Sequence, residues 1–328
     1  MFLTQSGCAE KSSPIIGLRT IGVAVPDIEA TIAFYEQVYP MAVVARYTVD
    51  AEVFGALTSD LSDSTVQVAE IELPNVYLRL FDFSAEKAPA GVERPVYQAG
   101  FNHMALISPL ENDAYAQFGS AGMEYISRGD APVDIRGVGY LYAYGRDPNG
   151  TMVELEMAPE PIRSGDFWVG HIATVTPDID RLVAFYESLL GYDVRTTLSI
   201  PKHPRLDDVA DLDGVSINGA WFVLRNIELE LWSYVKPETV AYEAPPLIDR
   251  LGYNLMTFEV TDLKAGIAHL KAQGIPIIGE PSNVAGWDIA YFRDPDGNLL
   301  ALEQRSKSAV TPSIAEKAWI DVATFGRE

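Results

Sequence analysis

Four side chains of this chain have the types and the spacing to support metal or acid–base chemistry. His103 and His171 are two of only four histidines, and each lies in a stretch that is expected to form a strand. Glu154 and Glu230 each lie between two apolar residues, so the two-residue period of a strand turns both carboxylates away from those neighbours. On an inner face, imidazoles and carboxylates could ligate a divalent ion or transfer protons. On an outer face, they would be ordinary solvated side chains.

An internal repeat supplies the elements that must position these residues. Residues 20–36 match residues 171–187 without a gap at an offset of 151, and both copies contain Pro-Asp and Phe-Tyr. Later in each half, Arg146–Gly150 returns as Arg293–Gly297 at an offset of 147. We interpret the pattern as a duplication, so the two copies can be compared position by position. His171 takes the place of Thr20, a difference for which chemistry in one copy is the natural cause.

Composition and charge limit the compartment and the partners. The 328 residues suffice for about two domains of ~150 residues, and a net charge of −22 without a basic stripe argues against nucleic acid and anionic membranes. The single cysteine, Cys8, rules out a disulfide within the chain, and no apolar run approaches the ~20 residues needed to cross a bilayer. Residues 1–3 are too short for the apolar core of a signal peptide. We therefore expect a cytoplasmic protein whose partner is a small molecule.

Each half divides again, which gives four modules of the order strand, helix, strand, strand, strand. Leu18–Val25 alternates as a strand does, and Pro26-Asp27 starts a helix that Asp27 can cap. In the second module, a helix is expected near residues 111–121, ahead of strands near 125–128, 139–145 and 151–157. The predicted modules span residues 18–83, 100–157, 168–234 and 252–304, within repeats at 15–157 and 167–304, and a tail at 305–328 is predicted to be helical.

This combination of motifs resembles the vicinal oxygen chelate superfamily. The shared features are a strand, Pro-Asp, a helix with Phe-Tyr and a final hairpin with Asp-Pro-(Asn/Asp)-Gly, and they extend over roughly residues 18–304. The superfamily includes glyoxalase I, extradiol dioxygenases and antibiotic-resistance proteins. The resemblance implies an α+β fold in which four βαβββ modules, in two tandem repeats, pair into two cupped mixed sheets. The fold alone does not determine the reaction.

The resemblance also implies a metal site. In this superfamily a module can offer a histidine from its first strand and a glutamate from its last, which places His103 with Glu154 in the second module and His171 with Glu230 in the third. Such a set suits one divalent ion per chain, Zn²⁺, Fe²⁺, Ni²⁺, Co²⁺ or Mn²⁺, and it implies that module two pairs with three and module one with four. The same positions in modules one and four hold residues that could not form such a site: Thr20, Arg79, Leu255 and Ala301.

The function implied is that of a metal-dependent glyoxalase-type enzyme acting on a small apolar oxygenated molecule as an isomerase, lyase or hydrolase. The ion would stabilise an enolate or oxyanion, and Glu154, or else Glu230, would move the proton. An extradiol-like ring-cleaving dioxygenase remains an alternative, although modules three and four lack its ligand set. A metal-free protein that binds an aromatic drug, of the bleomycin-resistance kind, is another. Monomer and homodimer both remain open.

Several further side chains are candidates for a substrate pocket. Tyr140 and Tyr142 alternate on one face of an expected strand, where they could line a pocket or pack in a core. Trp221 and Trp232 in the third module could line the same cup. His203 lies in a turn-rich insertion that could cover the cup and supply an acid or base, whereas His269 on a helix is expected to be structural. Arg79 could close its unused site by ion pairing or bind a substrate anion.

Overall fold

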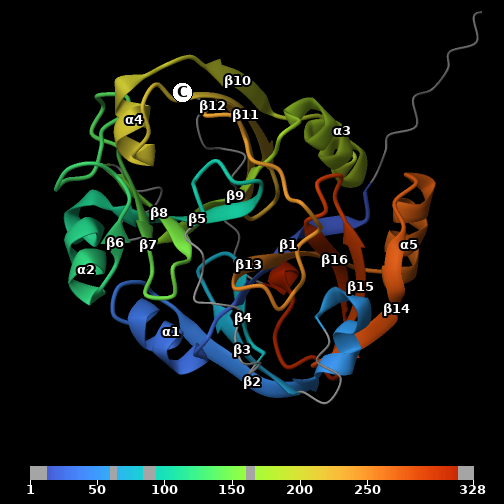
Figure 1. The fold of residues 1–328 in the computed structure, drawn as a ribbon. Coiled ribbons are helices and arrows are strands. Elements are labelled where there is room, and N and C mark those ends of the chain that lie inside the picture. Colours follow the sequence, from blue (N-terminus) through green and yellow to red (C-terminus); the bar gives the residue numbers. More distant parts are fainter. Residues whose placement is uncertain (1–12, 60–64, 84–93, 160–166, 317–328) are drawn as a thin grey trace, which may run out of the picture.

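A computed structural model describes residues 13–59, 65–83, 94–159 and 167–316 (Figure 1). All four modules have the predicted order of one strand, a helix and three strands. The first module consists of β1 (Ile15–Ala24), α1 (Ile28–Tyr35), β2 (Ala42–Asp50), β3 (Thr65–Glu72) and β4 (Tyr77–Asp82). The second consists of β5 (Gly100–Pro109), α2 (Ala114–Ala121), β6 (Glu124–Tyr125), β7 (Leu141–Arg146) and β8 (Met152–Ala158).

The second half of the chain repeats this order with one additional helix, α4. The third module consists of β9 (Trp168–Val175), α3 (Ile179–Leu190), β10 (Thr196–Ile200), α4 (Pro204–Ala210), β11 (Ser216–Val223) and β12 (Glu228–Lys236). The fourth consists of β13 (Gly252–Val260), α5 (Leu263–Ala272), β14 (Ile277–Val284), β15 (Trp287–Arg293) and β16 (Leu299–Arg305). Short 3₁₀ segments are η1 (Ala51–Leu57), η2 (Leu110–Asn112) and η3 (Ile314–Glu316). Among the described helices, none has the length and apolar character needed to span a bilayer.

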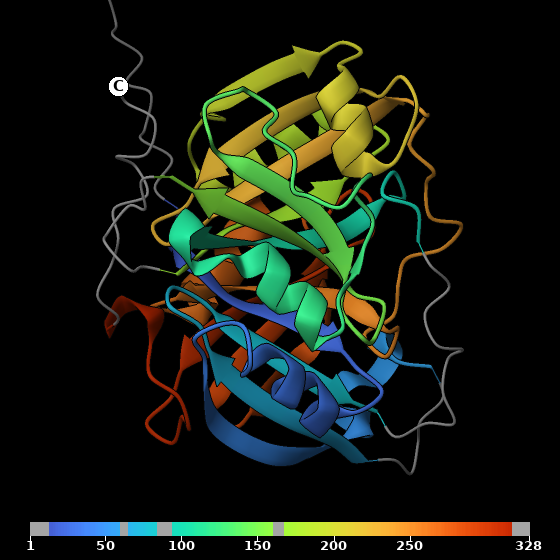
Figure 2. The same ribbon diagram turned by 90° about the vertical axis from the view of Figure 1, so that its left-hand side faces the viewer.

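The strands form two eight-stranded mixed sheets, one above the other in Figure 2. Modules two and three make the sheet β10-β11-β12-β9-β5-β8-β7-β6, and modules four and one make the sheet β14-β15-β16-β13-β1-β4-β3-β2. At the centre of each sheet, the first strands of two modules run antiparallel, and each also runs parallel to the last strand of its own module. The predicted α+β fold and the predicted pairing of modules are therefore confirmed. Each sheet contains one module from each sequence repeat. The domain bounds inferred from the repeats, residues 15–157 and 167–304, stay a prediction.

Aspartate side chains start the helices, as expected for α1. Asp27 accepts a hydrogen bond from the backbone N–H of Ala30 at 2.9 Å, and Asp178 and Asp262 cap α3 and α5 in the same way. These carboxylates satisfy backbone donors that have no partner within the helix. The helix expected at 111–121 starts later, because Asp113 adopts a left-handed conformation (φ 47°) that separates η2 from α2.

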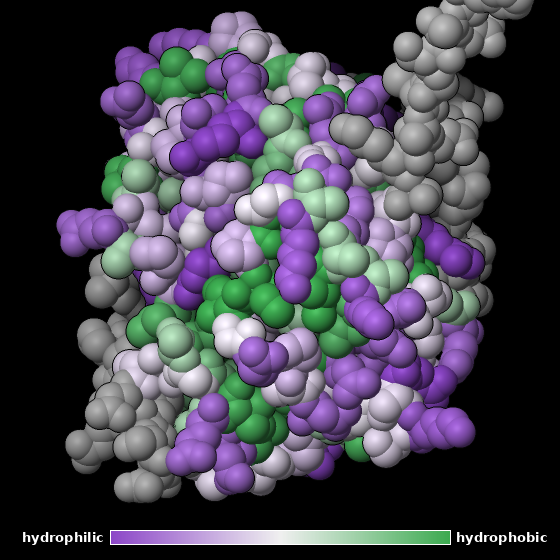
Figure 3. Space-filling model, turned by 90° about the vertical axis from the view of Figure 1, so that its right-hand side faces the viewer, coloured by the Kyte–Doolittle hydropathy of each residue, from purple (hydrophilic) through white to green (hydrophobic). Residues whose placement is uncertain are grey.

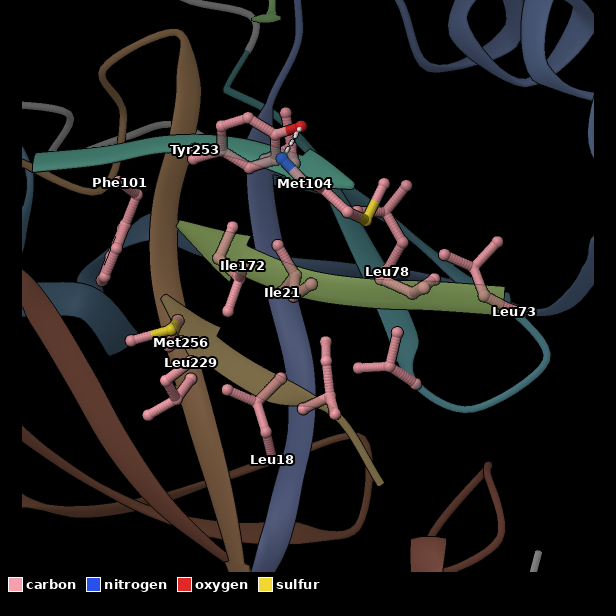
Figure 4. Packing of buried hydrophobic residues seen from close by; sticks show 14 of the residues in the cluster. Leu18, Ile21, Leu73, Leu78, Phe101, Met104, Ile172, Leu229, Tyr253 and Met256 are labelled. Atoms are coloured by element: carbon pink, nitrogen blue, oxygen red, sulfur yellow. Dashed lines mark hydrogen bonds between the residues drawn. The ribbon is translucent and has the colours of Figure 1, made fainter. Parts of the chain in front are cut away.

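A core of apolar side chains lies between the two sheets (Figure 4). In that view, Ile21 on β1 and Met256 on β13 face Met104 on β5 and Ile172 on β9, and all four belong to one buried cluster. Tyr253 ties the sheets together by polar contacts as well. Its hydroxyl accepts a hydrogen bond from the N–H of Met104 at 3.2 Å and donates one to the carbonyl of Met152 at 3.0 Å. The two sheets therefore share one core and hold each other in place.

The predicted helical tail lies mostly outside the described residues. Of residues 305–328, only those up to 316 are described, and residues 314–316 form the 3₁₀ turn η3. Figure 3 shows the side of the molecule that lies at the right of Figure 1, where polar side chains surround a central area of hydrophobic ones.

Candidate metal centre

Four side chains converge from the four central strands of the sheet built by modules two and three. His103 lies on β5, Glu154 on β8, His171 on β9 and Glu230 on β12. His171 Nε2 lies 3.0 Å from Glu154 Oε2, 3.1 Å from Glu230 Oε2 and 3.2 Å from His103 Nε2. His103 Nε2 lies 3.3 and 3.6 Å from the same two carboxylate oxygens. All four residues are buried, and among the described residues they are the one group of His, Cys, Asp and Glu side chains that could hold a metal ion.

The spacing of these atoms fits a shared divalent ion. Nitrogen and oxygen ligands bind such an ion at about 2.0–2.2 Å, so neighbouring ligands around it lie about 3.0–3.5 Å apart. The separations of 3.0–3.6 Å between imidazole nitrogens and carboxylate oxygens agree with that range. Two imidazoles and two carboxylates suit Zn²⁺, Fe²⁺, Ni²⁺, Co²⁺ and Mn²⁺ alike. The residues that the sequence predicted as ligands therefore fit a metal in both type and geometry.

Asn102 orients the ring of His103. The Oδ1 atom of Asn102 lies 2.9 Å from His103 Nδ1, while its Nδ2 group donates a hydrogen bond to the carbonyl of Val96 at 3.0 Å. Because the amide nitrogen is already used, the amide oxygen accepts the Nδ1 proton. Once the ring is neutral, this contact keeps the remaining proton on Nδ1 and leaves Nε2 unprotonated toward the cluster, which is the arrangement that a metal-binding histidine needs.

Two tryptophans hold the carboxylate of Glu230. Trp221 on β11 is paired with Glu230 on the neighbouring strand β12, and its indole N–H donates a hydrogen bond to Glu230 Oε1 at 2.9 Å. Trp232, two residues further along β12, donates to Oε2 at 2.5 Å. The two rings pack edge to face with their centroids 5.2 Å apart. We call Trp221 and Trp232 the indole pair; together they fix the direction in which Glu230 points.

The imidazoles and carboxylates of the cluster stabilise each other's charged forms. Burial alone would lower the pKa of His103, but hydrogen bonds to Glu154 and Glu230 raise it. The pKa of His171 is raised well above its ordinary value by the same carboxylates, again against the effect of burial. Burial would raise the pKa of Glu230, yet His171 and His103 lower it. The carboxylates therefore favour the protonated form of both imidazoles, and a metal ion must compete with protons for their nitrogens.

Glu156 is a candidate functional residue that the sequence reasoning missed. It follows Glu154 by two residues on β8, so both carboxylates face the same side of the sheet. Burial and the neighbouring Glu154 raise the pKa of Glu156 to about 7. Tyr140 donates a hydrogen bond to its Oε2, and its Oε1 lies 3.9 Å from His171 Nδ1. The two-residue spacing in Glu154-Leu155-Glu156 was the available signal.

A cavity of about 660 Å³ lies in front of the cluster and is lined by Glu154, His171 and Glu230. Four of the five predicted pocket residues line it as well: Tyr140, Tyr142, Trp221 and Trp232. Their aromatic rings give the cavity apolar walls close to the charged centre. Contact between these residues and a substrate stays a prediction.

The other two histidines lie apart from the cluster. His203 directly precedes α4, and of the following helix only Leu206, Val209 and Ala210 line the cavity in the described structure. His203 itself does not line the cavity, because the residues that reach it come later in the helix. The predicted place of His203 in the pocket is thus not matched by the structure. His269 on α5 has its Nε2 atom 2.9 Å from the carbonyl oxygen of Leu189, which agrees with the structural role expected for it.

The corresponding positions of the other sheet hold no comparable donor set. Arg79 is buried, with Nε 2.6 Å from Glu70 Oε1 and Nη1 2.7 Å from Glu303 Oε1. Arg19 lies 3.3 Å from Glu303 and 3.8 Å from Glu70, so two guanidinium groups balance two carboxylates. Of the two alternatives for Arg79, closure of the unused site by ion pairing is the one that the structure shows. Of the remaining three positions, Thr20 is buried and accepts a hydrogen bond from Arg19 Nη1 at 2.6 Å, while Leu255 and Ala301 are buried in an apolar cluster.

Comparison with known proteins gives one family. The model of the glyoxalase/bleomycin resistance protein/dioxygenase superfamily matches residues 168–302. Ethylmalonyl-CoA/methylmalonyl-CoA epimerase from Cereibacter sphaeroides is 31% identical over 140 residues, which cover 42% of this chain and 96% of that protein. Lactoylglutathione lyase GLX1 from Arabidopsis thaliana is 25% identical over 186 residues, and this match spans 55% of this chain and only 56% of the relative.

Solved structures support the same fold. Glyoxalase I from Zea mays superposes with a TM-score of 0.60 at 20% sequence identity, and the match covers 88% of this chain and 92% of that one. Identity at this level shows a shared architecture and leaves the reaction to be argued from the site.

Proposed function

This chain belongs to the glyoxalase/bleomycin resistance protein/dioxygenase superfamily, and from that premise we propose that it is a metal-dependent enzyme of the glyoxalase type. Its reaction is an isomerisation or elimination that begins with the loss of a proton from a carbon beside a carbonyl group. The curated relatives reported above are a lyase and an epimerase, which agrees with this class of reaction.

The observation that carries the proposal is the convergence of His103, Glu154, His171 and Glu230 at the floor of an aromatic cavity. These four side chains would hold the ion. A divalent ion bound there supplies Lewis acidity, which stabilises the negative charge that forms on a substrate oxygen when the proton leaves. The aromatic walls favour a small molecule with apolar groups.

Glu154 is the residue that we assign to proton transfer. Both oxygens of Glu230 receive hydrogen bonds from the indole pair, so this carboxylate is fixed in place. Glu154 has no such donors among the described residues; its partners there are the two imidazoles, and it borders the cavity. A carboxylate that is less firmly held can turn toward a substrate carbon, accept its proton and return it at a neighbouring atom.

The experiment is hydrogen exchange in deuterium oxide, followed by nuclear magnetic resonance, with hydroxyacetone and 2-hydroxyacetophenone as probes. In each probe the carbon that bears the hydroxyl group is bonded to the carbonyl carbon and carries the proton that a base would remove and replace by a deuteron. We expect the Zn²⁺-loaded chain to accelerate the exchange, and Glu154→Gln at saturating Zn²⁺ to slow it by at least about 100-fold.

The control is Glu280→Gln on β14 of the other sheet, which should exchange at the wild-type rate. Equal exchange by Glu154→Gln and wild type would show that another group is the base. An absence of metal-dependent exchange with both probes would contradict the proposed reaction class.

A further inference from the structure

The two cups of the molecule are filled differently. In the sheet of modules one and four, η1 connects β2 to β3 and places Phe54 in the interior, where it is only 3% exposed. The ring of Phe54 lies 6.0 Å from that of Phe81 and 5.8 Å from that of Phe83. Leu255 packs in the same cluster. Side chains of the protein itself therefore occupy this cup.

In the sheet of modules two and three, the equivalent connection from β10 to β11 carries α4. This helix has the sequence Pro-Arg-Leu-Asp-Asp-Val-Ala and contributes no aromatic ring, so the cup retains the cavity of about 660 Å³. Three residues of the four-ligand cluster line this cavity: Glu154, His171 and Glu230. Six aliphatic side chains from β10, α4 and the start of β11 line it as well: Leu198, Ile200, Leu206, Val209, Val215 and Ile217. The other charged residues in its lining are Arg136, Glu156, Arg195 and Glu228.

Hydrogen bonds hold α4 in place over the cavity. Asp207 accepts hydrogen bonds from the backbone N–H groups of Gly214 at 2.8 Å and Val215 at 2.7 Å, which ties the helix to the start of β11. From module two, the Ser127 hydroxyl donates to the carbonyl of Val209 at 2.8 Å, and the N–H of Arg128 donates to the carbonyl of Asp208 at 2.7 Å. Because these contacts join both modules, the aliphatic wall exists before any ligand enters, and binding need not order it.

We propose that β10, α4 and β11 form an apolar subsite that takes a neutral aryl or alkyl group of the substrate, while the oxygens of the same molecule face the four-ligand cluster. The inference rests on the proposed function and adds the shape of the substrate to it. A charged group among these six aliphatic side chains would lose its hydration, and none of the six could pair with it, so the subsite favours neutral tails. Each methylene buried there should strengthen binding about fourfold.

The test uses hydroxamates, which present two neighbouring oxygens to a metal and can carry different apolar groups. Binding of acetohydroxamate, hexanohydroxamate and benzohydroxamate to the Zn²⁺-loaded chain would be measured by calorimetry. We expect hexanohydroxamate, with four more methylenes than acetohydroxamate, to bind on the order of 100-fold more tightly. Val209→Phe should then weaken hexanohydroxamate by about tenfold through crowding and leave acetohydroxamate within about twofold.

Val53→Phe, on η1 of the other sheet, is the matched control and should leave all three affinities unchanged. Leu206→Ala, at a half-buried position, serves as a second variant should Val209→Phe fold poorly, and it should reduce the advantage of the longer chain. Metal-dependent binding of all three probes with equal affinity would overturn the apolar subsite and leave the metal centre standing. If none of the probes bound the Zn²⁺-loaded chain, both the subsite and the proposed function would be contradicted.

Discussion

The indole pair offers a sharp test of how the candidate centre is organised. Trp221→Phe and Trp232→Phe each remove one N–H donor to Glu230 and keep an aromatic ring in the same place. The donors concerned lie 2.9 Å from Oε1 and 2.5 Å from Oε2 of that carboxylate. Without one of them, Glu230 is free to rotate, and part of the ordering that a metal ion needs is lost.

The expected loss of Zn²⁺ affinity follows from the kind of contact that each substitution removes. A hydrogen bond to a charged group contributes about 1.5–3 kcal/mol. Loss of a partner that orients a metal ligand typically weakens metal binding by about 10–100-fold, or about 1.4–2.8 kcal/mol. We therefore expect each single variant to bind Zn²⁺ about 10–100-fold more weakly than wild type. Both donors hold the same carboxylate, so the effects of the two substitutions are not expected to add simply.

The assay is competition for Zn²⁺ with a chromophoric chelator. Trp168→Phe is the matched control, since Trp168 lines the same cavity and no hydrogen bond joins it to Glu230 in the described part of the chain. Urea unfolding of the metal-free variants would establish that they are folded. The reasoning would be refuted if both indole-pair variants bound Zn²⁺ as tightly as wild type and Trp168→Phe.

Two further predictions concern charge. Arg79→Met leaves Glu70 and Glu303 buried with one guanidinium between them. The free energy of unfolding measured in urea should therefore fall by about 3–5 kcal/mol, while the Zn²⁺ affinity should not change. A fall in the free energy of unfolding of less than about 1 kcal/mol would contradict the ion-pair interpretation. The raised pKa values of His103 and His171 mean that protons leave when metal binds, so the apparent Zn²⁺ affinity should rise with pH up to those pKa values. Affinities that were equal at pH 6, 7 and 8 would contradict this proton release.

Much of the fold and the centre could be predicted because both depend on periodic features of the sequence. The repeat gave the order of elements, and the two-residue period placed Glu154 and Glu230 on a face opposite their apolar neighbours. The superfamily pattern then assigned His103 and His171 to the same centre. These inferences need only positions along strands, which the sequence carries directly.

Other features depend on contacts between distant segments, which no periodicity encodes. The pairing of Trp221 with Glu230 follows from the register of β11 against β12, and the approach of Arg19 to Glu303 joins residues from opposite ends of the chain. Where the structure has α4, the sequence predicts only a turn-rich insertion, although Pro204 is a residue type favoured at the first position of a helix. Its seven residues are too few for a clear helical period.

The central claim is that His103, Glu154, His171 and Glu230 hold one divalent ion shared by modules two and three. Elemental analysis of purified wild type, His103→Ala and His171→Ala after exposure to the candidate ions, with His269→Ala as control, tests it most directly. The account predicts about one ion per chain in wild type and in His269→Ala, and loss of that ion in both of the other variants. No bound metal in wild type, or retention of a full ion in either His103→Ala or His171→Ala, would contradict it.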